Sequence, residues 1–222
     1  MRTSPQLLRL MQLASPALPV GAFAYSQGLE WAVENGMDDG KQVEAWITGI
    51  METSLARLDV PVLLRLHRAW SDAERDVMKW SAMLYASRET RELRLEEHQT
   101  AGALARLLRD LGILEAKPWI THPKRTFCAL FALAGARWGI DPQALCAAYL
   151  WAWTENQVAA AIKLVPLGQT AGQLILSNAA QRIPDLIDLG SRLEEWEIGG
   201  MAPGQVMASA LHETQNTRLF RS

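Results

Sequence analysis

The stretch of sequence that decides the fold is residues 141–168, which read DPQALCAAYLWAWTENQVAAAIKLVPLG. Asp141 followed by Pro142 indicates a helix start, because the acid can cap free amide groups and proline fits the first helical position. Pro166 and Gly168 indicate where this helix ends. Between these points the side chains are apolar on nearly every side. A helix of that kind belongs at the centre of a bundle.

A membrane span is not the expected explanation of this apolar run. Thr154–Gln157 lies at its middle, where a bilayer penalises charged and polar groups most heavily. The formal net charge of −2 also provides no basic surface for nucleic acid. At the N-terminus, Gln6, Arg9 and Gln12 interrupt the leucines, which predicts a short amphipathic helix and not a secretion signal. We therefore expect a cytoplasmic protein that binds neither membranes nor nucleic acid.

Helical periodicity extends through most of the other segments. Predicted helices cover residues 41–58, about 63–67, 125–138, 169–181 and 184–196. Asp39 with Gln42 forms a capping-box pattern at the first of these. No segment alternates between apolar and polar residues as a half-buried strand would. The 222 residues are therefore predicted to form one all-α domain, with roughly ten helices around the central one.

A second stretch, the proline segment Ser15–Glu30, is apolar yet cannot begin as a helix. It reads SPALPVGAFAYSQGLE. Pro16 and Pro19 each fix a φ angle and remove an amide donor. Surface loops are usually polar, so exposed side chains such as Leu18 and Phe23 need something to cover them. The cover is either the chain's own core or another protein.

Sequence patterns of catalytic and metal sites are missing from the chain. It contains no phosphate-binding loop, dinucleotide fingerprint or nucleophile elbow. Its four histidines are scattered, and Cys128 and Cys146 lack partners at metal-ligand spacing, so we expect free, buried thiols. No enzyme activity and no bound cofactor or metal are predicted.

Polar residues in the central helix leave two interpretations open. Glu155 and Asn156 need partners or water, because an unpaired buried carboxylate is very costly. They belong either to an internal hydrogen-bond network or to the lining of a hydrated passage.

The C-terminus also permits two interpretations. Residues 212–222 read HETQNTRLFRS, with Leu219 and Phe220 between two arginines. Chain ends usually fray unless something holds them. This end either packs back on its own domain or docks on a partner, for which Phe and Arg are favoured anchors.

Five separated motifs carry a resemblance to a known family. They are residues 10–15 with 18–21 (LMQLAS and LPVG), 25–30 (YSQGLE), 88–93 (RETREL), 163–169 (KLVPLGQ) and 218–222 (RLFRS). Together they span nearly the whole chain, in order, although residues 111–126 carry no matching motif. On these motifs the chain resembles the UreF family of urease accessory proteins.

The resemblance implies an all-helical, non-catalytic chaperone of nickel insertion into urease. Members of the family form homodimers, bind the accessory protein UreD (also called UreH) and recruit the GTPase UreG. The assembly acts on the urease apoprotein, and the family member positions UreG and influences its GTP hydrolysis. Nickel would pass transiently through an internal channel, with Glu155 as a lining residue. A generic helical oligomerising scaffold without a metal-delivery role stays open as the alternative.

The resemblance also implies which residues contact partners. Residues 198–222 form a C-terminal docking tail, in which the UreD contacts are Glu213, Thr214, Gln215, Arg218, Leu219, Phe220, Arg221 and Ser222. Tyr25 would pack at an interface or support this tail. Lys163, with Gly168 and Gln169 after it, would contact UreG. Lys163 has a second interpretation, because lysine is also favoured at a helix C-terminus by the helix dipole.

Overall fold

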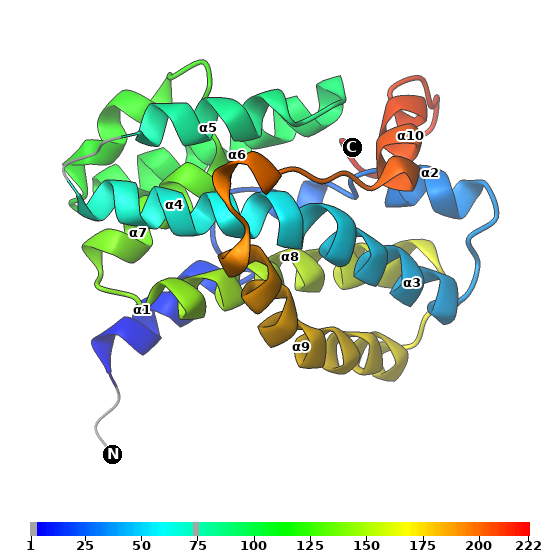
Figure 1. Ribbon diagram of the computed structural model, residues 1–222. Coiled ribbons are helices and arrows are strands. Elements are labelled where there is room, and N and C mark those ends of the chain that lie inside the picture. The colour runs from blue at the N-terminus through cyan, green and yellow to red at the C-terminus, as the bar shows by residue number, and fades with distance from the viewer. Residues whose placement is uncertain (1–3, 73–75) are drawn as a thin grey trace.

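The computed structural model describes residues 4–72 and 76–222, which form ten α-helices and no strand (Figure 1). The helices are α1 (Pro5–Ala14), α2 (Leu29–Glu34), α3 (Gly40–Ile50), α4 (Val60–Ser71), α5 (Val77–Ala86), α6 (Arg91–Asp110), α7 (Phe127–Arg137), α8 (Pro142–Leu164), α9 (Gln169–Arg192) and α10 (Pro203–His212). Short 3₁₀ turns cover Ala22–Ala24, Leu114–Ile120 and Glu195–Glu197. The prediction of a single all-α domain is confirmed.

The central position of α8 is confirmed by its neighbours. This helix packs against α1, α2, α3, α4, α7 and α9. The predicted cap is also present, because Asp141 Oδ1 accepts from the amides of Gln143 (3.0 Å) and Ala144 (2.9 Å). Leu145, Leu150 and Ala161 are completely buried. The sequence of α8 is apolar on nearly every side because the rest of the bundle surrounds this helix.

The prediction of two separate helices between residues 41 and 67 was wrong. Helix α3 continues through a wider π-helical segment, Met51–Asp59, directly into α4, so that the two form one long rod (Figure 1). Pro61 does not break this rod. It lacks an amide hydrogen, and the Arg57 carbonyl one turn before it accepts from the Gly199 amide (3.1 Å). A segment distant in sequence therefore satisfies a backbone group near the proline.

The predicted break before Pro184 was also wrong. Helix α9 runs without interruption from Gln169 to Arg192 with Pro184 inside it. Ile183 and Ile187, on either side of the proline, are buried in the core. Their burial outweighs the cost of the missing hydrogen bond, since each large aliphatic side chain contributes about 1.5–3 kcal/mol when buried.

Helix α10 packs against α2 and brings the C-terminal residues to the proline segment. Figure 1 shows the C-terminus beside α2 and α10. Gly28, just before α2, has φ +87°, and a Cβ atom there would lie 2.8 Å from the Ser209 amide nitrogen. Only glycine allows this approach of α10. The helix is thereby placed where the residues after it can reach the proline segment.

Candidate functional site

The last residues of the chain are hydrogen-bonded to the proline segment. The Ser222 carbonyl accepts from the Ser26 amide (2.5 Å), the Gln27 amide (3.0 Å) and the Ser26 hydroxyl (2.6 Å). One residue earlier, the Arg221 amide donates to the Ala24 carbonyl (2.8 Å). Residues nearly 200 positions apart thus form one continuous backbone surface, which we call the terminal surface (residues 24–27 and 218–222).

The carboxylate of Glu30 anchors the terminal surface to α2. It is buried at the start of α2 and accepts from the amides of Leu219 (2.5 Å) and Phe220 (2.9 Å). His212 Nε2 lies 3.1 Å from the same carboxylate. A buried carboxylate requires such donors, since leaving it unpaired would be costly.

A second buried carboxylate, Glu92, completes the anchor. Its Oε2 lies 2.8 Å from His212 Nδ1, and its Oε1 accepts from Arg218 Nη1 (2.8 Å). Glu213 accepts from the Arg91 amide through its Oε1 (2.9 Å). No sequence pattern predicted Glu30, Glu92 and His212 as anchors. Glu30 and Glu92 lie inside quoted motifs, and this was the only available signal.

The predicted docking residues divide into anchors and outward-facing side chains. Phe220 and Ser222 are buried, whereas Leu219 is 65% exposed and Arg218 and Arg221 are exposed. The first interpretation of the C-terminus, packing on its own domain, therefore holds for its backbone, and docking on a partner stays a prediction. Its backbone packs on its own domain, and Leu219 faces solvent.

Other predicted residues lie near this surface to different degrees. Lys163 Nζ lies 5.5 Å from the centroid of the Phe220 ring, a cation–π distance. Tyr25 is buried, its hydroxyl donates to Gln99 Oε1 (2.6 Å), and burial raises its pKa.

The remaining residues make local contacts or none with the terminal surface. Thr214 and Gln215 bond within their own turn, to the carbonyls of Leu211 (3.0 Å) and Thr217 (2.9 Å). Gly168 and Gln169 are exposed at the start of α9. In the described residues, no hydrogen bond joins Gly168 or Gln169 to the terminal surface.

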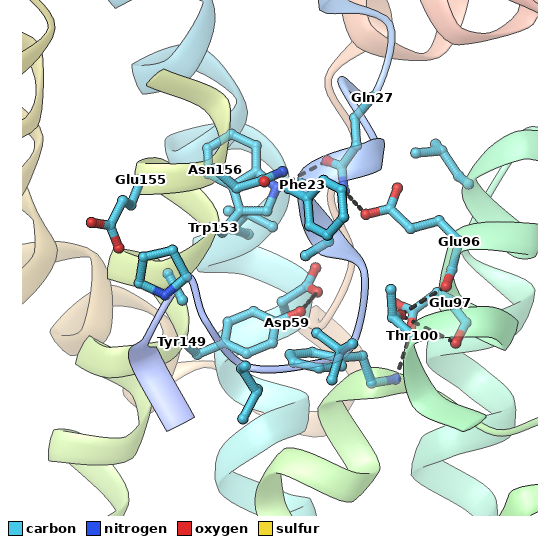
Figure 2. A pocket seen from close by; sticks show the side chains of 18 of the residues that line it. Phe23, Gln27, Asp59, Glu96, Glu97, Thr100, Tyr149, Trp153, Glu155 and Asn156 are labelled. Atoms are coloured by element: carbon cyan, nitrogen blue, oxygen red, sulfur yellow. Dashed lines mark hydrogen bonds between the residues drawn. The ribbon is translucent and has the colours of Figure 1, made fainter. Parts of the chain in front are cut away.

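A cavity of about 190 Å³ lies beside the proline segment (Figure 2). Its walls come from α1, the proline segment, the π-helical segment, α6 and α8. The apolar lining includes Leu13, Leu18 and Phe23, and Phe23 is 67% exposed at the rim. The cover that the sequence predicts for this segment is in part the chain's own core.

A fully bonded ionic network forms one side of the cavity. Arg88 binds Asp59 through both terminal nitrogens (2.5 and 3.1 Å) and Glu97 Oε1 through Nη2 (2.7 Å). Tyr149 donates to Asp59 Oδ1 (2.8 Å), and Glu97 Oε2 accepts from the Phe127 amide (2.7 Å). Burial opposes the charge of Arg88, but the two carboxylates outweigh it and raise the pKa of Arg88. Only Arg88 carried a sequence signal, as the first residue of a motif.

The cavity also contains a carboxyl oxygen without a partner. Glu96 Oε1 accepts from Gln27 Nε2 (2.8 Å), while Glu96 Oε2 is shielded from solvent and bonds to nothing in the described residues. Burial and the neighbouring Glu97 raise the pKa of Glu96 to about 8. Gln27 adopts a positive φ of 54°, and its Oε1 accepts from Trp153 Nε1 (2.9 Å) and Gln205 Nε2 (3.1 Å). Three hydrogen bonds thus hold the Gln27 side chain. They compensate for the positive φ of Gln27, which is unfavourable for a residue other than glycine.

Glu155 and Asn156, two polar residues of α8, both line the cavity. Asn156 belongs to the internal network, because its Nδ2 donates to the Tyr25 carbonyl (3.1 Å). Glu155 is half-buried and lines the cavity beside the proline segment, at the opposite side from Glu96 in Figure 2. Burial raises the pKa of Glu155.

Residues 4–72 and 76–222 contain neither a cluster of metal-ligating side chains nor a membrane-spanning helix. In that part of the chain, no three His, Cys, Asp or Glu side chains gather closely enough to hold a metal ion. No helix there combines the length and apolar character needed to cross a bilayer. Both cysteines are free and buried, as predicted.

Known proteins are similar to this chain along nearly its whole length. The UreF family model matches residues 37–180. The urease accessory protein UreF of Alkalilimnicola ehrlichii is 52% identical over 224 aligned positions, covering 99% of this chain and 98% of that protein. The UreF proteins of Teredinibacter turnerae (48% identical; 98% and 99% covered) and Pseudomonas putida (45% identical; 100% of both covered) are similarly related. The chain thus belongs to the UreF family of urease accessory proteins.

Proposed function

We propose that this protein is a non-catalytic maturation factor of urease, acting in the cytoplasm. On this proposal it joins UreD (UreH) and the GTPase UreG into one assembly, which delivers nickel to the urease apoprotein. It holds no permanent cofactor, and nickel passes it transiently. Its relatives carry the name of an accessory protein, and this supports a role in assisting urease.

One observation carries the docking part of the proposal. The terminal surface is held rigidly by Glu30 and Ser26, yet the Leu219 side chain is 65% exposed. An apolar side chain on a pre-organised backbone binds a partner at low entropic cost. UreD is the partner that we assign to this surface.

The test uses a surface variant that preserves the fold. Leu219→Asp should reduce co-purification of UreD by at least tenfold, because a charge would be buried at the interface centre. Leu174→Asp on α9 is the matched control, since Leu174 is 61% exposed but distant in sequence from the terminal surface. Equal capture of UreD by both variants, with unchanged helical circular dichroism, would remove the docking assignment.

Dimer formation and UreG recruitment are assigned to other surfaces. The exposed side chains of Leu7, Leu8 and Met11 on α1 support a contact between two copies. Met11→Asp should convert a dimer to a monomer in sedimentation analysis, and an unchanged dimer would contradict this contact.

Lys163, Gly168 and Gln169 are the proposed UreG contact. Replacing Gln169, exposed and outside the terminal surface, by Glu should weaken UreG capture without affecting UreD.

The cavity supports a passage role for Glu155. Glu155→Gln should lower nickel loading of urease while leaving capture of both partners unchanged. The alternative, a helical scaffold without a metal-delivery role, predicts that cells lacking this protein load urease with nickel fully. That result would exclude the delivery role.

A further inference from the structure

Among the described residues, a second pocket, of about 460 Å³, is lined by three arginines and by no acidic residue. Arg106 comes from α6, Arg125 from the loop before α7, and Arg221 from the terminal surface. The chain as a whole carries a formal net charge of −2. The concentration of positive charge at this pocket is therefore a local feature that the overall composition does not explain.

The most informative of the three is Arg125, because it is buried without an ionic partner. It is 8% exposed, and in the described residues it forms no ion pair with any carboxylate. Buried arginines are ordinarily paired. Arg88, whose side chain is 13% exposed, follows that rule with two carboxylates, Asp59 and Glu97.

The contacts of Arg125 account for only part of its guanidinium group. Nε donates to the His98 carbonyl (2.8 Å) and Nη1 to the His122 carbonyl (3.1 Å). These bonds attach the loop to α6, where Gly102 leaves room for the side chain; a Cβ there would lie 3.0 Å from Nε. Nη2 has no acceptor in the described residues. A purely structural role would require neither this free nitrogen nor the neighbouring arginines.

The other two arginines increase the positive charge without neutralising it. Arg106 is exposed and makes no side-chain hydrogen bond or ion pair with any described residue. Arg221 donates to the neutral amide oxygen of Gln99 (3.2 Å). Burial and the Arg106 charge lower the pKa of Arg125, and Arg125 in turn contributes to the lowered pKa values of His98 and His122, after burial. An anion in the pocket would relieve this repulsion.

We propose that Arg106, Arg125 and Arg221 form an oxyanion-binding site, which takes the carboxylate or phosphate group of a ligand between their guanidinium groups. Guanidinium groups match both oxyanions through paired N–H donors. The ligand group is supplied either by an acidic side chain of another protein or by a small phosphate-bearing molecule. This inference goes beyond the proposed function, and its test uses the isolated protein, so its outcome is independent of partner capture.

The first arm of the test measures thermal unfolding in inorganic phosphate against chloride at equal ionic strength. At about five times its dissociation constant, phosphate should raise the Tm by about 2–4 °C. Arg106→Gln should lose most of this rise, and it should fold normally because Arg106 is exposed and bonds to no other side chain in residues 4–72 and 76–222. Arg109→Gln on the same helix, outside the pocket, is the matched control and should retain the rise. The control also removes the general stabilisation that phosphate gives to any protein.

The second arm replaces phosphate by the dipeptide acetyl-Glu-Glu-amide, compared with acetyl-Gln-Gln-amide. A rise that needs both the acidic peptide and Arg106 assigns the site to a protein carboxylate. A rise with phosphate alone assigns it to a small phosphate-bearing ligand. Equal behaviour of the Arg106 and Arg109 variants in both arms would overturn the proposal.

Discussion

Lys163 Nζ lies 5.5 Å from the centroid of the Phe220 ring, so the end of the central helix contacts the buried anchor of the terminal surface. Lys163 and Phe220 belong to two different motifs, which the resemblance associates with two different partners. Through this contact the C-terminal end of α8 packs directly against the terminal surface. A substitution at Lys163 should therefore affect more than its own surroundings.

Replacing Lys163 by Met should loosen the terminal surface. The cation–π contact contributes about 1 kcal/mol, which corresponds to about fivefold faster hydrogen exchange at the Leu219 and Phe220 amides. Lys163→Arg should preserve slow exchange, because arginine can make the same contact. Identical exchange in all three proteins would show that the contact contributes nothing.

Replacing Glu30 by Gln should destabilise the protein by about 2–4 kcal/mol. The carboxylate accepts two amide hydrogens and faces His212, and hydrogen bonds to charged groups contribute about 1.5–3 kcal/mol each. Urea unfolding measures the loss. Glu34→Gln, at an exposed position of the same helix, should change stability by less than about 0.5 kcal/mol. A similar small effect at Glu30 would contradict its anchoring role.

Glu96 should make the protein less stable as the pH rises from about 4.5 to about 8. In the unfolded chain this carboxyl ionises near its ordinary pKa of 4.5, whereas in the fold it stays protonated until about 8. The unfolded state therefore binds fewer protons in this window, and folding loses about 1.4 kcal/mol per pKa unit.

Glu96→Gln should remove this dependence. At pH 8 the variant should be more stable than the parent protein by a few kcal/mol, and below pH 4 the two should be similar. Chemical unfolding across pH 4–9 provides the measurement. Parallel stability curves for the two proteins would show that Glu96 ionises normally.

Replacing Gln157 by Met should stabilise the protein. Gln157 in α8 is completely buried, and neither atom of its amide has a hydrogen-bond partner in the described residues. An unsatisfied buried polar group costs about 1–3 kcal/mol, and methionine has a similar shape without that cost. Thermal unfolding should show a higher Tm, whereas Gln143→Met at the exposed start of α8 should leave it unchanged. A lower Tm for the Gln157 variant would indicate that its amide is bonded.

The parts of the fold that sequence predicted well depend on local hydrogen bonds and periodicity. The Asp141 cap, the Asp39–Gln42 capping box and the burial of α8 all follow from residues within a few positions of one another. The prediction missed the continuity of the helices past Pro61 and Pro184 for the same reason. A proline weakens a helix locally, but contacts with distant segments decided whether these helices continued.

The site was predictable in its segments but not in its connections. Motifs at both ends pointed to the proline segment and to residues 218–222, yet only packing brings them together. Glu30 and His212 are separated by 182 positions, and no local pattern reports such a pair. No sequence pattern distinguished Arg106 and Arg125 from other charged residues, because they come together only when α6 packs beside the loop before α7.

Alone, the amino-acid sequence determined the helical class, the central helix and the family, because periodicity, caps and motifs are properties of short stretches. Tertiary structure alone decided which charges are neutralised. Among the described residues, it placed Arg88 between two carboxylates and buried Arg125 beside none, because burial and partner distance arise only when separate helices pack.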